Sequence, residues 1–310
     1  MQNKARAFCP AGISGFFQIC DKEPDGNPIT DLERVGARGG GFALKKGVLT
    51  EVDVVEQKKK SINVFINGKL APEAKTTRTV VDMLLERVSK PYSVTVKHNV
   101  EVPIGAGFGS SAAGALGVAL ALSEALNIHL TFNQIGRIAH VAEVKCRTGL
   151  GTVGGLMLGG CVIIIEPGAP NHAVIDRIPI SPNYQIVAGV YKSQLTSKFL
   201  ESTKKRAIIN EMGQKTLDKI LVDPSLEGFL HACREFAEKA GLATQRIRKL
   251  MDAAEKAESV GVAQNMLGEA VHALVEKDKV KNVVKTFERF MPPEKILVAE
   301  VSLQGAQLIA

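Results

Sequence analysis

The sequence contains no tryptophan and only three tyrosines among its 310 residues. Large aromatic side chains dominate extended recognition surfaces, so we expect no such surface here. A concentrated basic segment is also missing, although the formal net charge is +7. The densest basic runs are only Lys58–Lys60 and Lys204–Arg206. Because nucleic-acid-binding proteins gather such residues on one face, we expect no nucleic-acid partner; a positive field would instead attract small anions.

Cysteine usage and hydrophobic runs exclude two further classes. The five cysteines are odd in number and form no Cys-x-x-Cys pair, so neither a disulfide framework nor a zinc site is indicated. The longest apolar run, from Ala112 to Leu122, is too short to cross a bilayer, and no basic and apolar leader opens the chain. We therefore expect a soluble, cytoplasmic protein with no membrane partner.

The length of the chain favours two domains, because 310 residues exceed the usual size of a single hydrophobic core. Four prolines and Gly168 lie between Pro167 and Pro182 and argue against a continuous element there. We predict a first domain at residues 1–175 and a second at residues 176–310. The sequence does not determine the oligomeric state; a homodimer through exposed helices of the second domain is one alternative.

Hydrophobic periodicity predicts an α+β protein that begins with strands. Gly36–Gly41 is expected to interrupt the strand pattern, and a capping box at Thr131 and Gln134 to begin a helix that ends near Cys146. The strands expected in the first domain are Ala5–Phe8 and Phe16–Cys20 around a turn at Pro10–Gly12, then 42–45, 49–55, 61–66, 93–100 and 156–165. The other expected helices there are 77–88 and 111–126.

The second domain is expected to be mostly helical with a few strands. The predicted helices are 202–220, 225–240, 244–256 and 261–275, and the predicted strands are 185–191, 295–302 and 307–310.

A glycine-rich segment, Glu101–Leu116, runs directly into an apolar, alanine-rich helix. Gly105, Gly107 and Gly109 permit backbone angles closed to other residues, and Ser110 and Ser111 stand where the helix needs capping. A helix N-terminus presents unpaired amides and partial positive charge, so it binds anions well. The segment lacks the Gly-Lys-Ser/Thr ending of a Walker loop and the glycine spacing of a dinucleotide loop. A glycine-rich turn before a core helix is the alternative interpretation, but the detailed pattern favours nucleotide binding.

Pro103–Ala113 resembles the second signature of the GHMP kinases, the superfamily of galactokinase, homoserine kinase, mevalonate kinase and phosphomevalonate kinase. The start Ala7–Phe17, the stretch Ala139–Val153 and Glu166–Pro170 further resemble the archaeal pantoate kinases. The resemblance implies an α+β fold of two domains. The first would be β-rich with a left-handed βαβ-type nucleotide loop, and the second would be ferredoxin-like.

The same resemblance implies a kinase that uses ATP and magnesium. The acceptor would be the primary hydroxyl of a small hydroxy acid, with pantoate first and 4-phosphopantoate as its product on the route to coenzyme A. Mevalonate, a mevalonate phosphate or homoserine are alternative acceptors, and a catalytically impaired nucleotide-binding protein is an alternative of another class. The residues expected to bind the nucleotide are Pro103, Gly105, Gly107, Gly109, Ser110, Ser111 and Ala112.

Ser111 and Glu143 are the expected magnesium ligands. Ser111 begins the helix beside the phosphates, and Glu143 is the only acidic residue between Gln134 and Arg147. A hydroxyl and a carboxylate, together with phosphate oxygens and water, suit the oxygen ligands that magnesium prefers. Composition alone would make Glu143 a surface charge on an amphipathic helix; the resemblance assigns it to the metal.

Three residues are expected to bind the substrate. His140 lies three residues before Glu143 and so shares its helix face, while Arg38 offers a guanidinium to a carboxylate. Ser14, in the first motif, is the third. A histidine satisfied within the fold and an arginine in a flexible loop are the alternative interpretations.

The sequence departs from the family pattern at the catalytic position. Many relatives carry an aspartate where this chain has Thr152. Threonine does not accept a proton near neutral pH, so we expect Thr152 to orient the acceptor hydroxyl instead. Ile13 replaces the lysine of mevalonate kinases, and the third signature is present only as Gly261–Glu269. Phosphoryl transfer depends more on positioning and charge neutralisation than on a strong base, so the expected reaction class is kept.

Overall fold

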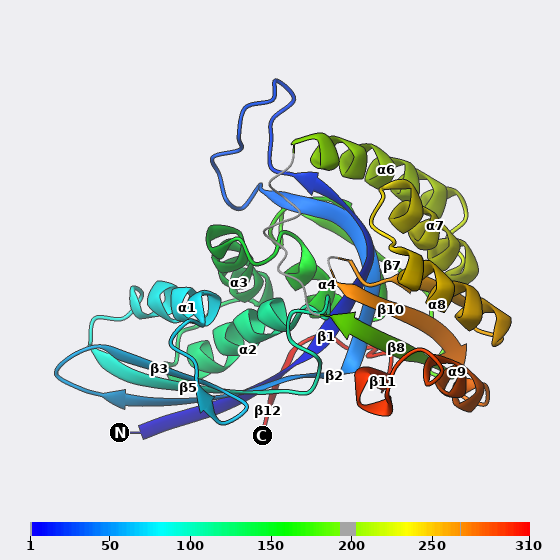
Figure 1. Cartoon of the computed structure of the whole chain (residues 1–310). Coiled ribbons are helices and arrows are strands. Elements are labelled where there is room, and N and C mark those ends of the chain that lie inside the picture. The colour runs from blue at the N-terminus through cyan, green and yellow to red at the C-terminus, as the bar shows by residue number, and fades with distance from the viewer. Residues whose placement is uncertain (1, 193–202, 267) are drawn as a thin grey trace.

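The computed structural model describes residues 2–192, 203–266 and 268–310, and its core is a long antiparallel pair of strands (Figure 1). Strand β1 (Gln2–Cys20) pairs with β2 (Gly36–Glu56) over nearly its whole length. The remaining strands of the eight-stranded sheet are β3 (Ser61–Ile66), β4 (Lys69–Leu70), β5 (Tyr92–Val100), β6 (Cys161–Glu166), β7 (Val174–Ile178) and β12 (Gln307–Ile309).

The turn predicted at Pro10–Gly12 and the interruption predicted at Gly36–Gly41 are both wrong. The chain stays extended through Pro10–Gly12, where register shifts between Pro10 and Ala11 and again near Ser14 absorb the irregularity. Gly36–Gly41 begins β2 instead of breaking it. A Cβ atom at Gly41 would lie 1.7 Å from the carbonyl oxygen of Ile13, so glycine lets the two strands approach closely there.

Three helices cover one face of this sheet (Figure 1). They are α1 (Lys75–Leu85), α2 (Ser110–Ala125) and α3 (Phe132–Cys146). The central helix, α2, is buried on nearly all sides because it packs on β1 and β2 and also against α1 and α3. The capping box of α3 is confirmed: the Thr131 amide donates to Gln134 Oε1 at 2.8 Å, and the Gln134 amide donates to Thr131 Oγ1 at 3.3 Å.

The strand predicted at 156–165 begins later than expected. A short helix, α4 (Thr152–Leu158), occupies its first residues, and β6 begins only at Cys161. Gly159 and Gly160 separate the two elements with positive φ angles of 78° and 88°. A Cβ atom at Gly159 would lie 2.7 Å from the backbone of Gln304, so the C-terminal segment passes tightly over this junction.

The second sheet has four antiparallel strands in the order β11-β8-β10-β9. Numbered along the chain this order is 4-1-3-2, and with helices after the first and third strands it is the ferredoxin-like arrangement. The α+β class is therefore confirmed. The strands are β8 (Tyr184–Lys192), β9 (Gly261–Gln264), β10 (Glu269–Glu276) and β11 (Ile296–Glu300), and the helices are α6 (Thr203–Val222), α7 (Leu226–Lys239), α8 (Gln245–Lys256), α9 (Val280–Phe287) and the 3-10 turn η1 (Pro293–Lys295).

The helix predicted at 261–275 is wrong, because this segment forms the hairpin of β9 and β10. Seven of the eight residues of β10 are buried, so its apolar residues follow one another without alternation. A short buried strand and a buried helix look alike by periodicity alone. The first residue of the helix predicted from Ser202 lies outside the described residues.

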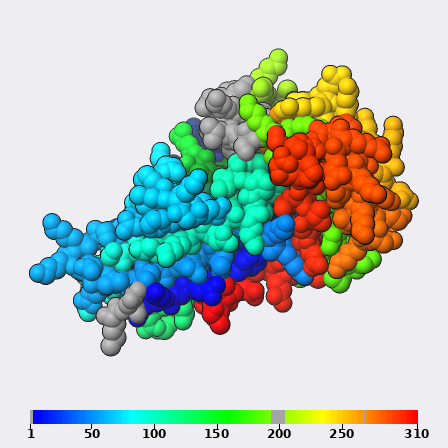
Figure 2. Space-filling view, turned by 60° about the horizontal axis from the view of Figure 1, so that its bottom comes forward, coloured from blue at the N-terminus to red at the C-terminus, as the bar shows by residue number. Residues whose placement is uncertain are grey.

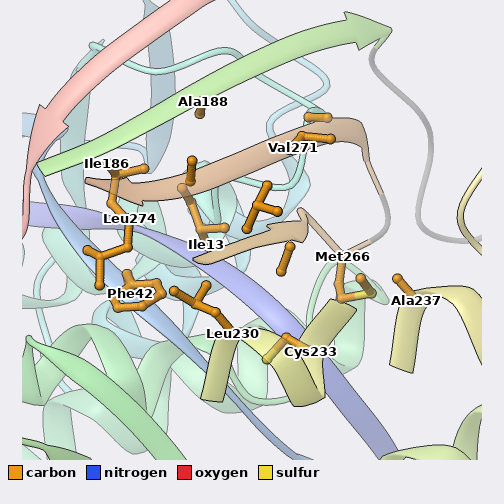
Figure 3. Close-up of a cluster of buried hydrophobic side chains, with 14 of the residues drawn as sticks. Ile13, Phe42, Ile186, Ala188, Leu230, Cys233, Ala237, Met266, Val271 and Leu274 are labelled. Carbon is orange, nitrogen blue, oxygen red and sulfur yellow. The ribbon is translucent and has the colours of Figure 1, made fainter. Parts of the chain in front are cut away.

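The two sheets share one hydrophobic core. Phe229 of α7 lies with its ring centroid 6.2 Å from that of Phe16 and 5.5 Å from that of Phe42, both of the first sheet. Figure 3 shows Ile13 and Phe42 beside Leu230 and Cys233 in this cluster. The space-filling view shows an elongated molecule, with the light-blue residues of β3 and its neighbours at one end and the yellow and orange residues of the second sheet and its helices at the other (Figure 2).

The chain crosses between the two parts more than once. Strand β7 spans the division drawn at residues 175 and 176 and pairs with β6, while β12 returns from the C-terminus to pair with β1. The division at 175–176 stays a prediction. Among the described helices none has the length and the apolar run needed to cross a membrane.

Candidate active site

The glycine-rich segment forms a loop of left-handed turns that ends at the N-terminus of α2. Gly105, Gly107 and Gly109 have φ angles of 75°, 78° and 61°, which side chains rarely tolerate. Gly109 is the N-cap residue, and no side chain of the described residues caps this helix. The expectation that Ser110 or Ser111 would cap it is therefore wrong. The first amides of α2 have no partner within the helix and are available to an anion.

The first motif of the chain lies directly against this loop. The Gly12 amide donates to the carbonyl of Phe108 at 3.0 Å. The methyl group of Thr152 lies 2.9 Å from the place where a Cβ atom at Gly109 would stand, and 3.6 Å from the corresponding place at Gly12. The structure thus brings Thr152, predicted as the catalytic position, to the end of the nucleotide loop.

The third glycine-rich segment supports the loop from the other side. A Cβ atom at Gly107 would lie 2.9 Å from the carbonyl oxygen of Met266, and one at Gly268 would lie 2.5 Å from that of Ala106. The Met266 amide also donates to the carbonyl of Ser14 at 2.8 Å. The turn between β9 and β10 therefore contacts both the loop and the first motif. Ser14 is partly buried, and its hydroxyl stays only a predicted substrate contact.

Ser111 and Glu143, predicted as a pair from residues 32 apart, are in direct contact. Ser111 Oγ donates to Glu143 Oε1 at 2.5 Å. Glu143 lies on α3 and is only 3% exposed, so the alternative of a surface charge is wrong. Burial raises the pKa of Glu143, and the hydrogen bonds from Ser111 and Thr148 oppose this by lowering it.

These two residues fit a magnesium ion that is also bound by phosphate. The described residues contain no group of three or more histidine, cysteine, aspartate or glutamate side chains able to hold a metal. Glu143 is the carboxylate that contacts Ser111. Glu143 also has no basic partner among the described ion pairs. A buried carboxylate without a countercharge, beside a hydroxyl and a helix N-terminus, favours a cation that nucleotide phosphates accompany.

His140 is buried beside Glu143 on α3, at 1% exposure. Its Nε2 donates to the carbonyl oxygen of Val35 at 2.8 Å. Burial lowers the pKa of His140, so the ring is uncharged at neutral pH. His140 is therefore a histidine whose Nε2 is already satisfied within the fold, and a substrate contact would have to come from Nδ1 as an acceptor; its substrate role stays a prediction.

Arg38 lies in β2 and not in a flexible loop. Its guanidinium donates to the Ile165 carbonyl at 2.9 Å and to Glu166 Oε2 at 2.9 Å. Gln18 and Gln214 accept two further, longer hydrogen bonds. Arg38 would have to exchange one of these partners to bind a carboxylate, and this role too stays a prediction.

Thr148 was not among the residues singled out from the sequence. Its Oγ1 donates to Glu143 Oε1 at 2.6 Å, and Thr76 Oγ1 lies 2.9 Å from Thr148 Oγ1. A Cβ atom at the next residue, Gly149, would lie 2.2 Å from Glu143 Oε2. The only signal in the sequence is a Thr-Gly pair just beyond the end of the helix that carries Glu143.

Comparison with known proteins gives a consistent picture. The GHMP kinases N terminal domain family matches residues 75–160, which include the loop, α2 and α3. A pantoate kinase from Thermococcus kodakarensis is 33% identical over 288 residues, covering 90% of this chain and 91% of that protein. A pantoate kinase from Methanocaldococcus jannaschii is 28% identical over 282 residues, covering 89% of this chain and 95% of that protein.

Solved structures with similar folds include a "Phosphotransferase related to CoA biosynthesis pathway", with a TM-score of 0.84 and 27% identity, which covers 99% of this chain and 98% of that one. Another is "MDDEF in complex with MVAPP, AMPPCP and Magnesium", with a TM-score of 0.74 and 15% identity, covering 100% of this chain and 99% of that one. At this identity the second likeness shows the fold alone.

Proposed function

Since this chain belongs to the GHMP kinases, and within them to the family of the pantoate kinases, we propose that it transfers the γ-phosphoryl group of ATP to the primary hydroxyl of pantoate. The product would be 4-phosphopantoate, an intermediate on the route to coenzyme A. The observation that carries the proposal is the convergence of the Ser111–Glu143 pair and Thr152 at the two ends of one short segment, Gly109–Ser111.

The loop and α2 bind the donor. The amides at the start of α2 face the nucleotide phosphates, and the positive end of the helix dipole favours their charge. Ser111 has one proton and two lone pairs, so it can donate to Glu143 and still offer oxygen to a cation. A magnesium ion held there would supply neutralisation of the charge that develops on the phosphoryl oxygens.

The acceptor is positioned by groups that do not act as a strong base. Thr152 lies at the loop and can hydrogen-bond the substrate hydroxyl, keeping it in line with the γ-phosphorus. His140 and Ser14 would bind the rest of the substrate, with Arg38 as a further carboxylate partner. Because the transition state is loose, alignment and charge neutralisation account for most of the rate enhancement in such reactions.

The proposal is tested with the full-length protein, magnesium and ATP against a panel of acceptors. The panel is pantoate, pantothenate, mevalonate, mevalonate phosphate and homoserine, and the measurements are ADP release and identification of the phosphorylated product by mass spectrometry. We expect turnover with pantoate to exceed that with every other acceptor by at least about tenfold, which corresponds to roughly 1.4 kcal/mol of transition-state discrimination. A preference for mevalonate or a mevalonate phosphate would contradict the assignment of pantoate as the acceptor. The assignment of kinase activity would still stand.

Thr152 also favours a second candidate, a nucleotide-binding protein that has lost catalysis. Such a protein would bind ATP through the loop but release no ADP in response to any acceptor. Equilibrium binding of ATP, measured beside the turnover assay, separates the two. Tight binding with acceptor-independent ADP release alone would support the second candidate.

A further inference from the structure

Thr148 forms two hydrogen bonds with Glu143, one through its backbone amide and one through its hydroxyl. It follows Arg147, which ends α3 in a left-handed conformation with a φ of 57°. The Thr148 amide donates to the carbonyl of Glu143 at 3.0 Å, which closes the end of the helix. Its hydroxyl then reaches back to the carboxylate of the same residue, donating to Oε1 at 2.6 Å.

The carboxylate of Glu143 is consequently fixed from several directions. Oε1 accepts one hydrogen bond from Ser111 and a second from Thr148. Gly149 stands so close to Oε2 that a Cβ atom would lie 2.2 Å from it. With Oε1 held by two donors, rotation about the last bond of the side chain is restricted and Oε2 keeps one place.

The hydrogen bonds continue from Thr148 into α1. A hydroxyl has a single proton, and that of Thr148 goes to the carboxylate, so Thr76 is the donor in the 2.9 Å contact between the two threonines. Thr76 is 7% exposed and lies in the first turn of α1. The result is a directed chain, Thr76 to Thr148 to Glu143, that fixes the Thr148 hydroxyl as well.

We propose that Thr148, supported by Thr76, is a positioning residue that orients the Glu143 carboxylate toward the cation of the bound nucleotide. The inference rests on the proposed function, since it requires that Ser111 and Glu143 bind the metal. Hydrogen bonds to charged groups contribute more than those between neutral groups, because the charged partner attracts the donor more strongly. Without the Thr148 hydroxyl, Ser111 would be the one remaining donor to Glu143 Oε1 while it also binds the cation.

The test compares Thr148→Val, which keeps the shape and removes the hydroxyl, with Thr148→Ser, which keeps the hydroxyl. We expect Thr148→Val to raise the magnesium concentration for half-maximal turnover by about tenfold, as one charged hydrogen bond implies. The KM for pantoate should change less than twofold, and Thr148→Ser should restore the magnesium dependence to within about threefold. A role confined to ending the helix rests on the backbone amide, which both variants keep, so it would leave the magnesium dependence of both unchanged.

A readout without turnover is the rise in melting temperature caused by magnesium with a non-hydrolysable ATP analogue. The rise should shrink in Thr148→Val and return in Thr148→Ser. The matched control is Thr79→Val. Thr79 lies on the same helix as Thr76, but its hydroxyl contacts Cys146 Sγ at 3.3 Å and takes no part in the hydrogen bonds that lead to Glu143. Thr79→Val should leave both readouts unchanged.

Thr76→Val keeps the proposal testable if Thr148→Val fails to fold. It should raise the half-maximal magnesium concentration by about threefold, since it removes a neutral hydrogen bond one step farther from the carboxylate. Equal magnesium dependence in Thr76→Val, Thr79→Val and the unmodified protein, or an unchanged dependence in a folded Thr148→Val, would overturn the inference. If the unmodified protein neither binds nor turns over magnesium-ATP, the proposed function itself fails.

Discussion

Glu143 is the residue on which the proposed magnesium-ATP site depends most. It is a buried carboxylate that receives two hydroxyl hydrogen bonds and has no basic partner among the described ion pairs, so its charge is costly in the free protein. Its raised pKa has a defined consequence. Protonation stabilises the fold below the ordinary carboxyl pKa, and this contribution is lost as the pH rises through the pKa of the folded state.

Glu143→Gln should therefore separate stability from function. We expect turnover to fall at least about 100-fold, because the carboxylate that would hold the charge-neutralising magnesium ion is lost. Without nucleotide the variant should be as stable at pH 7.5 as the unmodified protein, or more so, since no buried charge has to be formed. Thermal unfolding with and without magnesium-ATP checks both parts. Full turnover in the variant would exclude Glu143 from the metal site.

Substitutions of Thr152 test whether the proposed site acts by positioning the acceptor hydroxyl. Its methyl group packs near Gly12 and Gly109, and a valine at this place would keep that packing while removing the hydroxyl. Thr152→Val should lower kcat by about tenfold, the effect of losing one orienting hydrogen bond. Thr152→Asp should change kcat by less than about tenfold in either direction.

Steady-state kinetics with saturating ATP measure both substitutions, and circular dichroism verifies the fold. An increase of about 100-fold or more in Thr152→Asp would mean that a base is needed, since general-base catalysis contributes on this scale. The chain would then have an impaired active site.

Among the elements, α1 and α2 are joined to the first sheet by a buried histidine. His98 of β5 contacts Thr50 Oγ1 at 2.9 Å through Nδ1 and Thr77 Oγ1 at 3.0 Å through Nε2. A Cβ atom at Gly114 of α2 would lie 3.5 Å from the ring, so the small residues of this helix accommodate the imidazole. Burial lowers the pKa of His98 to about 4.

This depressed pKa predicts acid sensitivity of the fold. The unfolded chain binds a proton near pH 6.5 and the folded protein does not, so the stability is present above pH 6.5 and is lost as the pH falls toward 4. Between pH 6.5 and 5 the unmodified protein should lose about 1.6 kcal/mol more unfolding free energy than His98→Gln. Urea unfolding at the two pH values measures this difference. Parallel losses in both proteins would contradict it.

Short sequence motifs at helix ends predicted the helices that have them. The capping box at Thr131 and Gln134 fixes the start of α3, and the apolar run after Ser110 fixes α2, so both helices are confirmed to within a residue or two. The β9–β10 hairpin was missed because β10 is buried on both faces and its pattern carries no period. The extended path through Pro10 and the strand at Gly36–Gly41 depend on contacts with distant strands, which no local pattern encodes.

Contacts within the candidate site were also predicted only where a sequence signal existed. The Ser111–Glu143 contact could be predicted because the family resemblance joins two motifs that are far apart in sequence. Thr148 and Thr76 could not, because their roles arise from a hydrogen-bond chain between α1 and the end of α3. The turn at Met266 likewise supports the nucleotide loop only once the hairpin has formed.

At the scale of the whole molecule, the proposed site depends on both sheets, because the loop is backed by the turn between β9 and β10. The shared core joins them physically. Phe229 of α7 is fully buried and packs edge to face against Phe16 and Phe42. Asn210 of α6 adds a polar connection, because its amide accepts from the Ile19 amide at 2.9 Å and donates to the Ile19 carbonyl at 3.0 Å.

We therefore expect the two sheets to unfold together. The absence of tryptophan allows a single introduced one to report on each sheet: Tyr92→Trp in β5 for the first and Tyr184→Trp in β8 for the second. The two fluorescence transitions in urea should coincide, as in a two-state system. Phe229→Ala should cost about 3–5 kcal/mol and lower both midpoints equally, because the cavity would open between the sheets. A shift of the Tyr184→Trp transition alone would show that the second sheet unfolds independently.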